Sequence, residues 1–139
     1  MGSICKVLEL DVAPEAAWDA VRDWGAVHTR LASGFAVDTE IDGNDRVVTF
    51  GNGMVQREPL VDLDDDARRL VYSAVDSPIG ASHYNGCVEV SAGEERASRL
   101  VWRIDFLPNE VAAGLDAAME LGAQAMRRTL EGSAVSAER

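Results

Sequence analysis

The chain has 139 residues, of which 47% are apolar and 27% charged, and its 24 acidic and 13 basic residues give a formal net charge of −11. This length is typical of one domain with one core, and no apolar run is long enough to cross a bilayer. Excess acid repels phosphate backbones and anionic headgroups, so the composition argues against nucleic acid as a partner.

The first predicted elements are a strand and two short helices. Residues 4–12 alternate between apolar and polar side chains, as is typical of a half-buried strand. Pro14 suits the first turn of a helix, and Trp18 and Val21 follow it at helical spacing. A second short helical segment is expected over residues 26–31.

Six further strands are predicted in the middle of the chain, separated by residues that favour tight turns. Their expected ranges are 35–41, 46–50, 54–63, 69–75, 82–91 and 98–107. Connections as short as Gly51-Asn52-Gly53 imply antiparallel neighbours. The last strand alternates most clearly, with Trp102 and Phe106 on one face.

A long helix is predicted to follow the last strand. Apolar residues recur there at helical spacing over about twenty residues: Val111, Leu115, Ala118, Met119, Gly122, Met126 and Leu130. Such a stripe packs along an apolar surface. Residues 133–139 show no periodicity and are expected to form a flexible tail, so the expected domain spans residues 1–132.

This order of elements, together with four segments, resembles the START/Bet v 1-like (SRPBCC) superfamily in its bacterial polyketide cyclase/dehydrase-like branch. The segments are AWDAVRDWG (17–25), REPLVDLD (57–64), LVYS (70–73) and WRIDFLP (102–108). The resemblance implies an α+β helix-grip fold, in which a seven-stranded curved antiparallel sheet surrounds the C-terminal helix, with two short helices after the first strand. It also implies a cavity between sheet and helix for lipids, polyketides or other hydrophobic molecules.

Five residues are candidates for lining this cavity: Trp102, Phe106, Tyr84, Leu115 and Met119. The alternative for each is ordinary core packing. Tyr84 is expected to point inward, and its neighbour His83 outward, because successive residues of a strand face opposite sides.

Glu58, Tyr72 and His28 are the candidates for proton transfer, since a buried acid, a phenol or an imidazole can each exchange a proton with a bound molecule. The alternative for Glu58 is a structural ion pair with Arg103 or Arg69, and the alternative for His28 is an exposed or capping position. Pro59 can bulge the strand, so the pattern leaves open whether Arg57 or Glu58 faces inward.

Cysteine and acidic residues give no metal or redox motif, and neither a metal nor a cofactor is expected. Cys5 and Cys87 lie in apolar stretches and are interpreted as reduced core thiols. The strand order implied by the resemblance separates them too far for a disulfide. The acidic run at residues 62–66 is interpreted as a solvated turn.

The primary hypothesis is a cytoplasmic protein, monomer or homodimer, that binds a small hydrophobic, partly oxygenated molecule. The first alternative is a polyketide cyclase/dehydratase-type enzyme that uses the same pocket, and the sequence leaves open whether the protein is an enzyme. The second alternative is a protein-interaction module of this fold, which a filled core and an apolar surface patch would favour.

Overall fold

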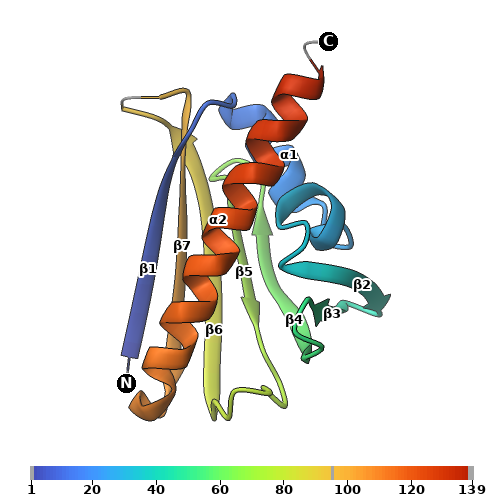
Figure 1. The fold of residues 1–139 in the computed structure, drawn as a ribbon, viewed down its shortest axis with the longest axis vertical. Coiled ribbons are helices and arrows are strands. Elements are labelled where there is room, and N and C mark those ends of the chain that lie inside the picture. Colours follow the sequence, from blue (N-terminus) through green and yellow to red (C-terminus); the bar gives the residue numbers. More distant parts are fainter. Residues whose placement is uncertain (1, 95, 138–139) are drawn as a thin grey trace.

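The computed structural model describes residues 2–94 and 96–137, which form one curved sheet with helices against its concave side (Figure 1). The elements are β1 (Gly2–Leu10), α1 (Pro14–Arg22), η1 (Val27–Leu31), β2 (Ala36–Asp42), β3 (Asp45–Phe50), β4 (Val55–Asp64), β5 (Arg69–Ser73), β6 (His83–Ala92), β7 (Ser98–Leu107), η2 (Asn109–Val111) and α2 (Ala112–Ala137). The seven strands lie in the order β1-β7-β6-β5-β4-β3-β2, which confirms the predicted helix-grip fold.

Neighbouring strands pair antiparallel throughout the sheet. The predicted strand ranges agree with the observed ones to within two residues at each end. In β7 the apolar alternation puts Leu100, Trp102, Ile104 and Phe106 on the buried face. β1 pairs with β7 along its whole length, from Gly2 opposite Phe106 to Leu10 opposite Ser98. The first strand of the chain therefore depends on the last one for its hydrogen bonds.

The sheet bends where its pairing register shifts. One shift lies between Ala36 and Asp38 in β2, and the other between Leu60 and Asp62 in β4. An extra residue at such a point bends the strand and increases its twist. The first half of β4 pairs with β3 and the second half with β5, so this bend lies where the sheet passes from one partner strand to the other.

Helix α1 begins at Pro14 and buries Trp18 against the sheet. Trp18 Nε1 donates to Asp65 Oδ1 at 2.9 Å, and Arg22 Nε donates to the same oxygen at 2.7 Å. The acidic turn between β4 and β5 is therefore a docking point for α1. The second helical segment, η1, is a single turn of π-helix.

Helix α2 crosses the concave side of the sheet toward α1 and η1 (Figure 1). Lys6 of β1 binds Asp116 at 2.8 Å and Glu120 at 3.1 Å, so the first strand is tied to the last helix. α2 continues to Ala137, past Gly132 where the sequence predicted its end. Residues 138 and 139 of the expected tail lie outside the described residues, and its flexibility stays a prediction.

No helix among the described residues is long and apolar enough to span a membrane.

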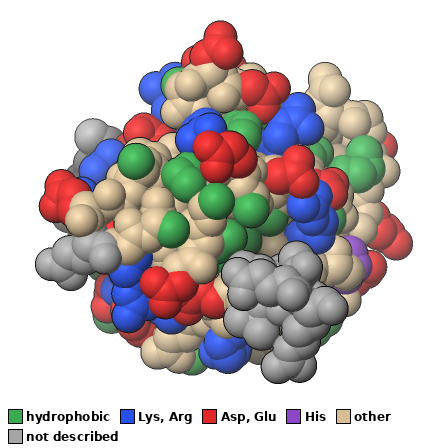
Figure 2. All heavy atoms as spheres, turned by 90° about the horizontal axis from the view of Figure 1, so that it is seen from above, with side chains coloured by type: hydrophobic (Ala, Val, Ile, Leu, Met, Phe, Trp, Pro, Cys, Tyr) green, Lys and Arg blue, Asp and Glu red, His purple; other side chains and the backbone are tan. Residues whose placement is uncertain are grey.

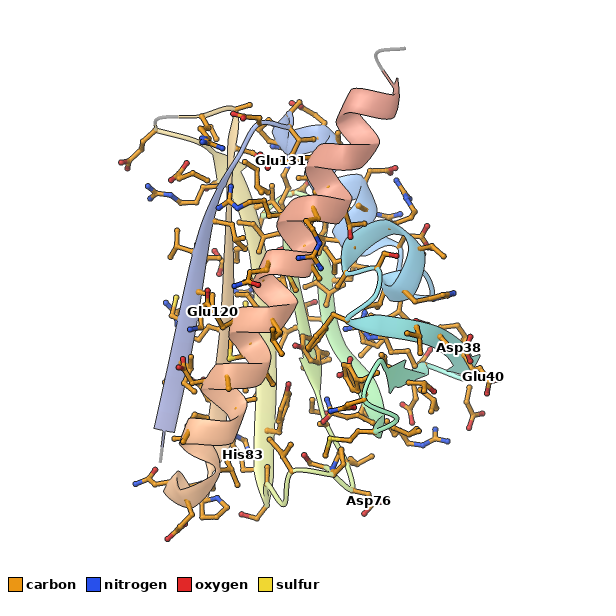
Figure 3. All side chains as sticks on the ribbon, viewed as in Figure 1. Asp38, Glu40, Asp76, His83, Glu120 and Glu131 are labelled. Atoms are coloured by element: carbon orange, nitrogen blue, oxygen red, sulfur yellow. The ribbon has the colours of Figure 1, made fainter. Side chains whose placement is uncertain are left out.

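The surface carries side chains of both charges. Figure 2, a view from above, shows acidic and basic side chains interspersed around small apolar areas. Asp38 and Glu40 extend outward from the edge strand β2 (Figure 3). Such exposed charge on an edge strand discourages pairing with another sheet.

The interpretation of both cysteines as core residues is wrong. Cys5 is exposed and Cys87 half-buried, and both thiols are free. They lie on the outer face of the sheet, in register with Arg103 between them, because β7 separates their strands. The apolar neighbours that suggested burial belong to the opposite face of each strand.

Candidate ligand-binding cavity

A cavity of about 420 Å³ lies between the concave face of the sheet and α2. Its wall is largely apolar. The sheet contributes Val48, Val88, Trp102 and Ile104, and α2 contributes Leu115, Ala118, Met119 and Met126. Gly122 lies on the same side of α2, where an added side chain would come within 3.0 Å of the Trp102 ring. The volume is that of a site for a small organic molecule.

Polar side chains gather at the buried end of this cavity, and we call them the polar cluster: Arg46, Gln56, Glu58, Tyr72 and Tyr84. Each is at most 7% exposed. Arg46 of β3 lies directly opposite Glu58 of β4 in the sheet register. Arg46 Nε donates to Glu58 Oε1 at 2.7 Å, and Gln56 Nε2 donates to Glu58 Oε2 at 2.6 Å. Both carboxylate oxygens of Glu58 are therefore engaged.

The guanidinium of Arg46 contacts two aromatic rings. Its central carbon lies 3.9 Å from the centre of the Trp24 ring and 5.1 Å from that of the Tyr72 ring. Cation–π contacts of this kind fix a guanidinium plane and are stronger where water is excluded. Within the part of the chain that the structure describes, Nε is the only atom of this guanidinium with a hydrogen-bond partner. Its two terminal amino groups remain available as donors at the cavity wall.

The Tyr72 hydroxyl is a second donor at this end. Trp102 Nε1 donates to its oxygen at 2.9 Å, which leaves the phenolic proton to be given to another group. Burial is the main cause that raises the pKa of Tyr72 well above its usual value, and the nearby charge of Glu58 is the second. Burial likewise raises the pKa of Tyr84. Both phenols therefore stay protonated at neutral pH.

The cavity opens between α2, the β3–β4 turn and the loop after β5. Leu121 of α2, Met54 beside the turn and Ile79 of the loop line the cavity and are exposed or half-buried. Leu121 is 60% exposed, so an apolar side chain stands in water at the rim. Phe35 and Phe50, which also line the cavity, pack edge to face with their ring centres 5.2 Å apart. Most of the wall that a hydrophobic molecule meets is therefore apolar, although the exposed Asn52, Gln124 and Arg128 also line the cavity.

The chain as a whole matches one family model. Residues 1–138 match the family described as polyketide cyclase / dehydrase and lipid transport. The chain belongs to this family. Among curated proteins, none matches the sequence.

Solved structures resemble this member of the polyketide cyclase / dehydrase and lipid transport family at low identity. XoxI from Bacillus cereus gives a TM-score of 0.82 at 19% identity, covering 100% of this chain and 99% of its own. A START superfamily protein from Mycobacterium smegmatis gives 0.76 at 12%, covering 94% and 97%. Truncated norcoclaurine synthase from Thalictrum flavum gives 0.68 at 16%, covering 91% of each. The predicted resemblance to the START/Bet v 1-like superfamily is confirmed.

Most of the predicted site residues meet at this family member's cavity. Trp102, Tyr84, Leu115, Met119, Glu58 and Tyr72 all line it. Tyr84 points inward and His83 is exposed at one end of β6, as their alternation predicted (Figure 3). Whether these residues bind or transform a ligand stays a prediction.

Phe106 and His28 lie away from the cavity wall. Phe106 is fully buried on β7, where its ring fills the space beside Gly2 of β1. His28 Nδ1 lies 3.0 Å from Thr39 Oγ1, so it connects η1 with β2. Position in the fold therefore favours packing for Phe106 and a structural contact for His28.

The structure shows which of Arg57 and Glu58 faces inward. Glu58 is 4% exposed and faces the cavity, while Arg57 points outward to Asp42 and Asp45. The ion pair expected for Glu58 exists, but neither Arg103 nor Arg69 is its partner. Arg69 binds Asp62, and Arg103 lies beside Cys5 on the outer face.

Sequence reasoning missed Arg46, Gln56 and Trp24. Arg46 stands near the start of a short strand, and no role was assigned to it from the sequence. The signal lay in the hairpin: pairing outward from the Gly51-Asn52-Gly53 turn puts residue 48 opposite 56 and residue 46 opposite 58. Two polar side chains and a carboxylate thus share the inward face.

Proposed function

We propose that this protein binds a small hydrophobic molecule whose oxygen-bearing end reaches the polar cluster. The observation that carries the proposal is a cavity with an apolar wall and one group of polar side chains at its buried end. Burial of the apolar body would supply most of the affinity, and hydrogen bonds to the cluster would fix the orientation. The family's description, which includes lipid transport as well as cyclase and dehydrase activity, supports this class of ligand.

The geometry of the polar cluster favours binding over proton transfer. Each oxygen of Glu58 accepts a hydrogen bond, one from Arg46 and one from Gln56, so these two donors hold the carboxylate in place as part of the cluster's own network. The raised pKa of Tyr72 keeps its proton in place. The open cavity also argues against a module whose core is filled and whose surface alone makes contacts.

The first test is native mass spectrometry of the purified protein, followed by organic extraction of any bound molecule. We expect an adduct with a lipid-like or polyketide-like mass, or uptake from a panel of fatty acids, sterols and aromatic polyketides. An unliganded protein that takes up none of the panel would contradict the proposal.

A bulky side chain placed in the cavity tests the same proposal, and α2 offers a matched control position. Ala118 lines the cavity, whereas its neighbour Ala117 is exposed on the outer side of α2. Ala118→Trp is expected to abolish uptake, and Ala117→Trp to leave it unchanged, with both variants folded by circular dichroism. Equal uptake by the two variants would place the ligand elsewhere.

A further inference from the structure

We infer that the polar cluster selects a ligand with an uncharged hydrogen-bond acceptor, such as a ketone, ester or amide carbonyl, and rejects the corresponding carboxylate. This inference rests on the proposed function, because it names the chemical class that the same cavity accepts. Three features of the cluster lead to it: its charge balance, its supply of donors and its rigidity.

The buried end of the cavity is electrically balanced. Arg46 and Glu58 are both buried and form a direct ion pair at 2.7 Å. The other members of the cluster, Gln56, Tyr72 and Tyr84, are neutral side chains. Of the charged residues that line the cavity among those described, the third, Arg128, is exposed on α2 and leaves the cluster's balance unchanged. A ligand carboxylate would therefore add a net negative charge to a neutral, water-poor site.

The available hydrogen-bonding groups are mainly donors. The terminal amino groups of Arg46 have no partner among the described residues, whereas the Tyr72 hydroxyl already interacts with Trp102 and with the Tyr84 hydroxyl. The two oxygens of Glu58 each already accept one hydrogen bond. A ligand that presents an acceptor therefore satisfies groups that the protein leaves open. A hydrocarbon of the same shape would leave them unpaired.

The cluster cannot easily adjust to a second negative charge. The guanidinium lies over the Trp24 ring with the Tyr72 ring also in contact, and its Nε is bound to Glu58, so its position is restrained. A carboxylate at the free amino groups would gain attraction to Arg46 but meet repulsion from Glu58 at similar range. It would also lose its hydration, and a neutral site compensates a buried anion for that loss less well than a site with a net opposite charge. A carbonyl gains a charge-assisted hydrogen bond with a far smaller desolvation cost.

Three probes of nearly the same shape separate these effects: methyl naphthyl ketone, the naphthoate anion and isopropylnaphthalene. Their affinities for the wild-type protein at neutral pH are measured by quenching of tryptophan fluorescence. We expect the ketone to bind at least about tenfold more tightly than either of the others. Naphthoate binding as tightly as the ketone would overturn the inference.

A single variant should reverse the selectivity. Glu58→Gln keeps the side-chain shape and still offers an acceptor to Arg46, but it leaves the buried end with a net positive charge. We expect naphthoate then to bind more tightly than the ketone. Glu40→Gln, on the outward side of β2 (Figure 3), removes the same charge from the molecule and should not change the ratio. An unchanged ratio in Glu58→Gln would overturn the inference.

The probes also distinguish failure of the inference from failure of the proposed function. Equal binding of all three would leave a hydrophobic container without selectivity, so only the inference would fail. No binding of any probe, together with no uptake from the ligand panel, would count against both. If Glu58→Gln does not fold, naphthamide against naphthoate on the wild-type protein makes the same comparison, and the neutral amide should bind about tenfold more tightly.

Discussion

Arg57 and Glu58 are neighbours on β4, yet their ion pairs differ greatly in environment. Arg57 is about two-fifths exposed and pairs with surface aspartates, whereas Glu58 and Arg46 are almost fully buried. A surface pair is weakened by water and by the entropy of two mobile side chains. A buried pair has already lost its hydration, so removal of one partner leaves an uncompensated charge.

Removal of Glu58 should therefore be far more costly than removal of Arg57. We expect Glu58→Ala to lower the free energy of unfolding by about 3–5 kcal/mol, because Arg46 stays buried without a counter-charge. Arg57→Ala should cost about 0–1 kcal/mol. Urea denaturation of both variants measures the difference. The double change Arg46→Met with Glu58→Met should restore most of the loss, and failure to do so would show that the pair itself is stabilising.

Two glycines give a second contrast at the scale of single residues. Gly86 lies opposite Tyr72 in the sheet, and an added methyl group would overlap the Tyr72 ring. Gly114 lies in α2 with open space around its Cα atom. We expect Gly86→Ala to destabilise the protein by about 1–3 kcal/mol through overpacking. Gly114→Ala should stabilise it by about 0.5–1 kcal/mol, since alanine favours a helix. Thermal unfolding of the two variants checks both signs.

At the scale of elements, α1 is attached to the sheet through the turn between β4 and β5. The hydrogen bond from Arg22, and then the one from Trp18, lowers the pKa of Asp65 below its usual value of 3.8. A carboxyl group whose pKa is lower in the folded chain contributes stability above its unfolded pKa. That contribution is lost as the pH falls through the folded pKa.

Asp65→Asn should consequently lower the urea midpoint at neutral pH, because α1 loses its charged anchor. The difference from the wild-type midpoint should begin to shrink as the pH falls below about 3.8, the usual pKa, and should vanish once the pH is below the lowered pKa of the folded chain, where the wild-type carboxyl is also neutral. Asp66→Asn, one residue along the same turn, serves as the control and should behave like the wild type. A difference that persists unchanged in acid would point to packing instead of charge.

The sequence predicts the elements well because each follows from local chemistry. Strand β7 alternates in period two, and turns such as Gly51-Asn52-Gly53 end their strands wherever they occur. Partners across strands are harder to predict, because they depend on register as well as on type. Arg46 meets Glu58 only through the β3–β4 pairing, and Trp24 reaches Arg46 only through tertiary packing. The part of the site that was missed is the part made by such non-local contacts.

On the scale of the whole molecule, the chain has two tyrosines, and both face the cavity. Burial raises the pKa of each above its usual value of 10.0. The unfolded chain therefore loses these protons at lower pH than the folded one. Their burial contributes stability below about pH 10, and that contribution is lost as the pH rises through the folded pKa values.

Alkaline titration should show this coupling directly. We expect tyrosinate absorbance to stay low beyond pH 10 and then to rise in the same transition as the loss of circular dichroism. The absence of any exposed tyrosine makes the signal specific to the cavity. Ionisation near the usual pKa with the secondary structure intact would mean that water reaches the polar cluster freely.

Helix α2, to which Lys6 of β1 is bound, is the last element of the chain, and this has a consequence for how the protein is made. Synthesis proceeds from β1 to α2, so the ribosome completes all seven strands before it produces the helix that covers them. Until α2 emerges, only α1 and η1 can cover the concave face, and the apolar part that α2 covers, around Trp102, is open to water. A hydrophobic molecule bound as proposed would be enclosed only after that moment, so its capture would be one of the last events in the maturation of the protein.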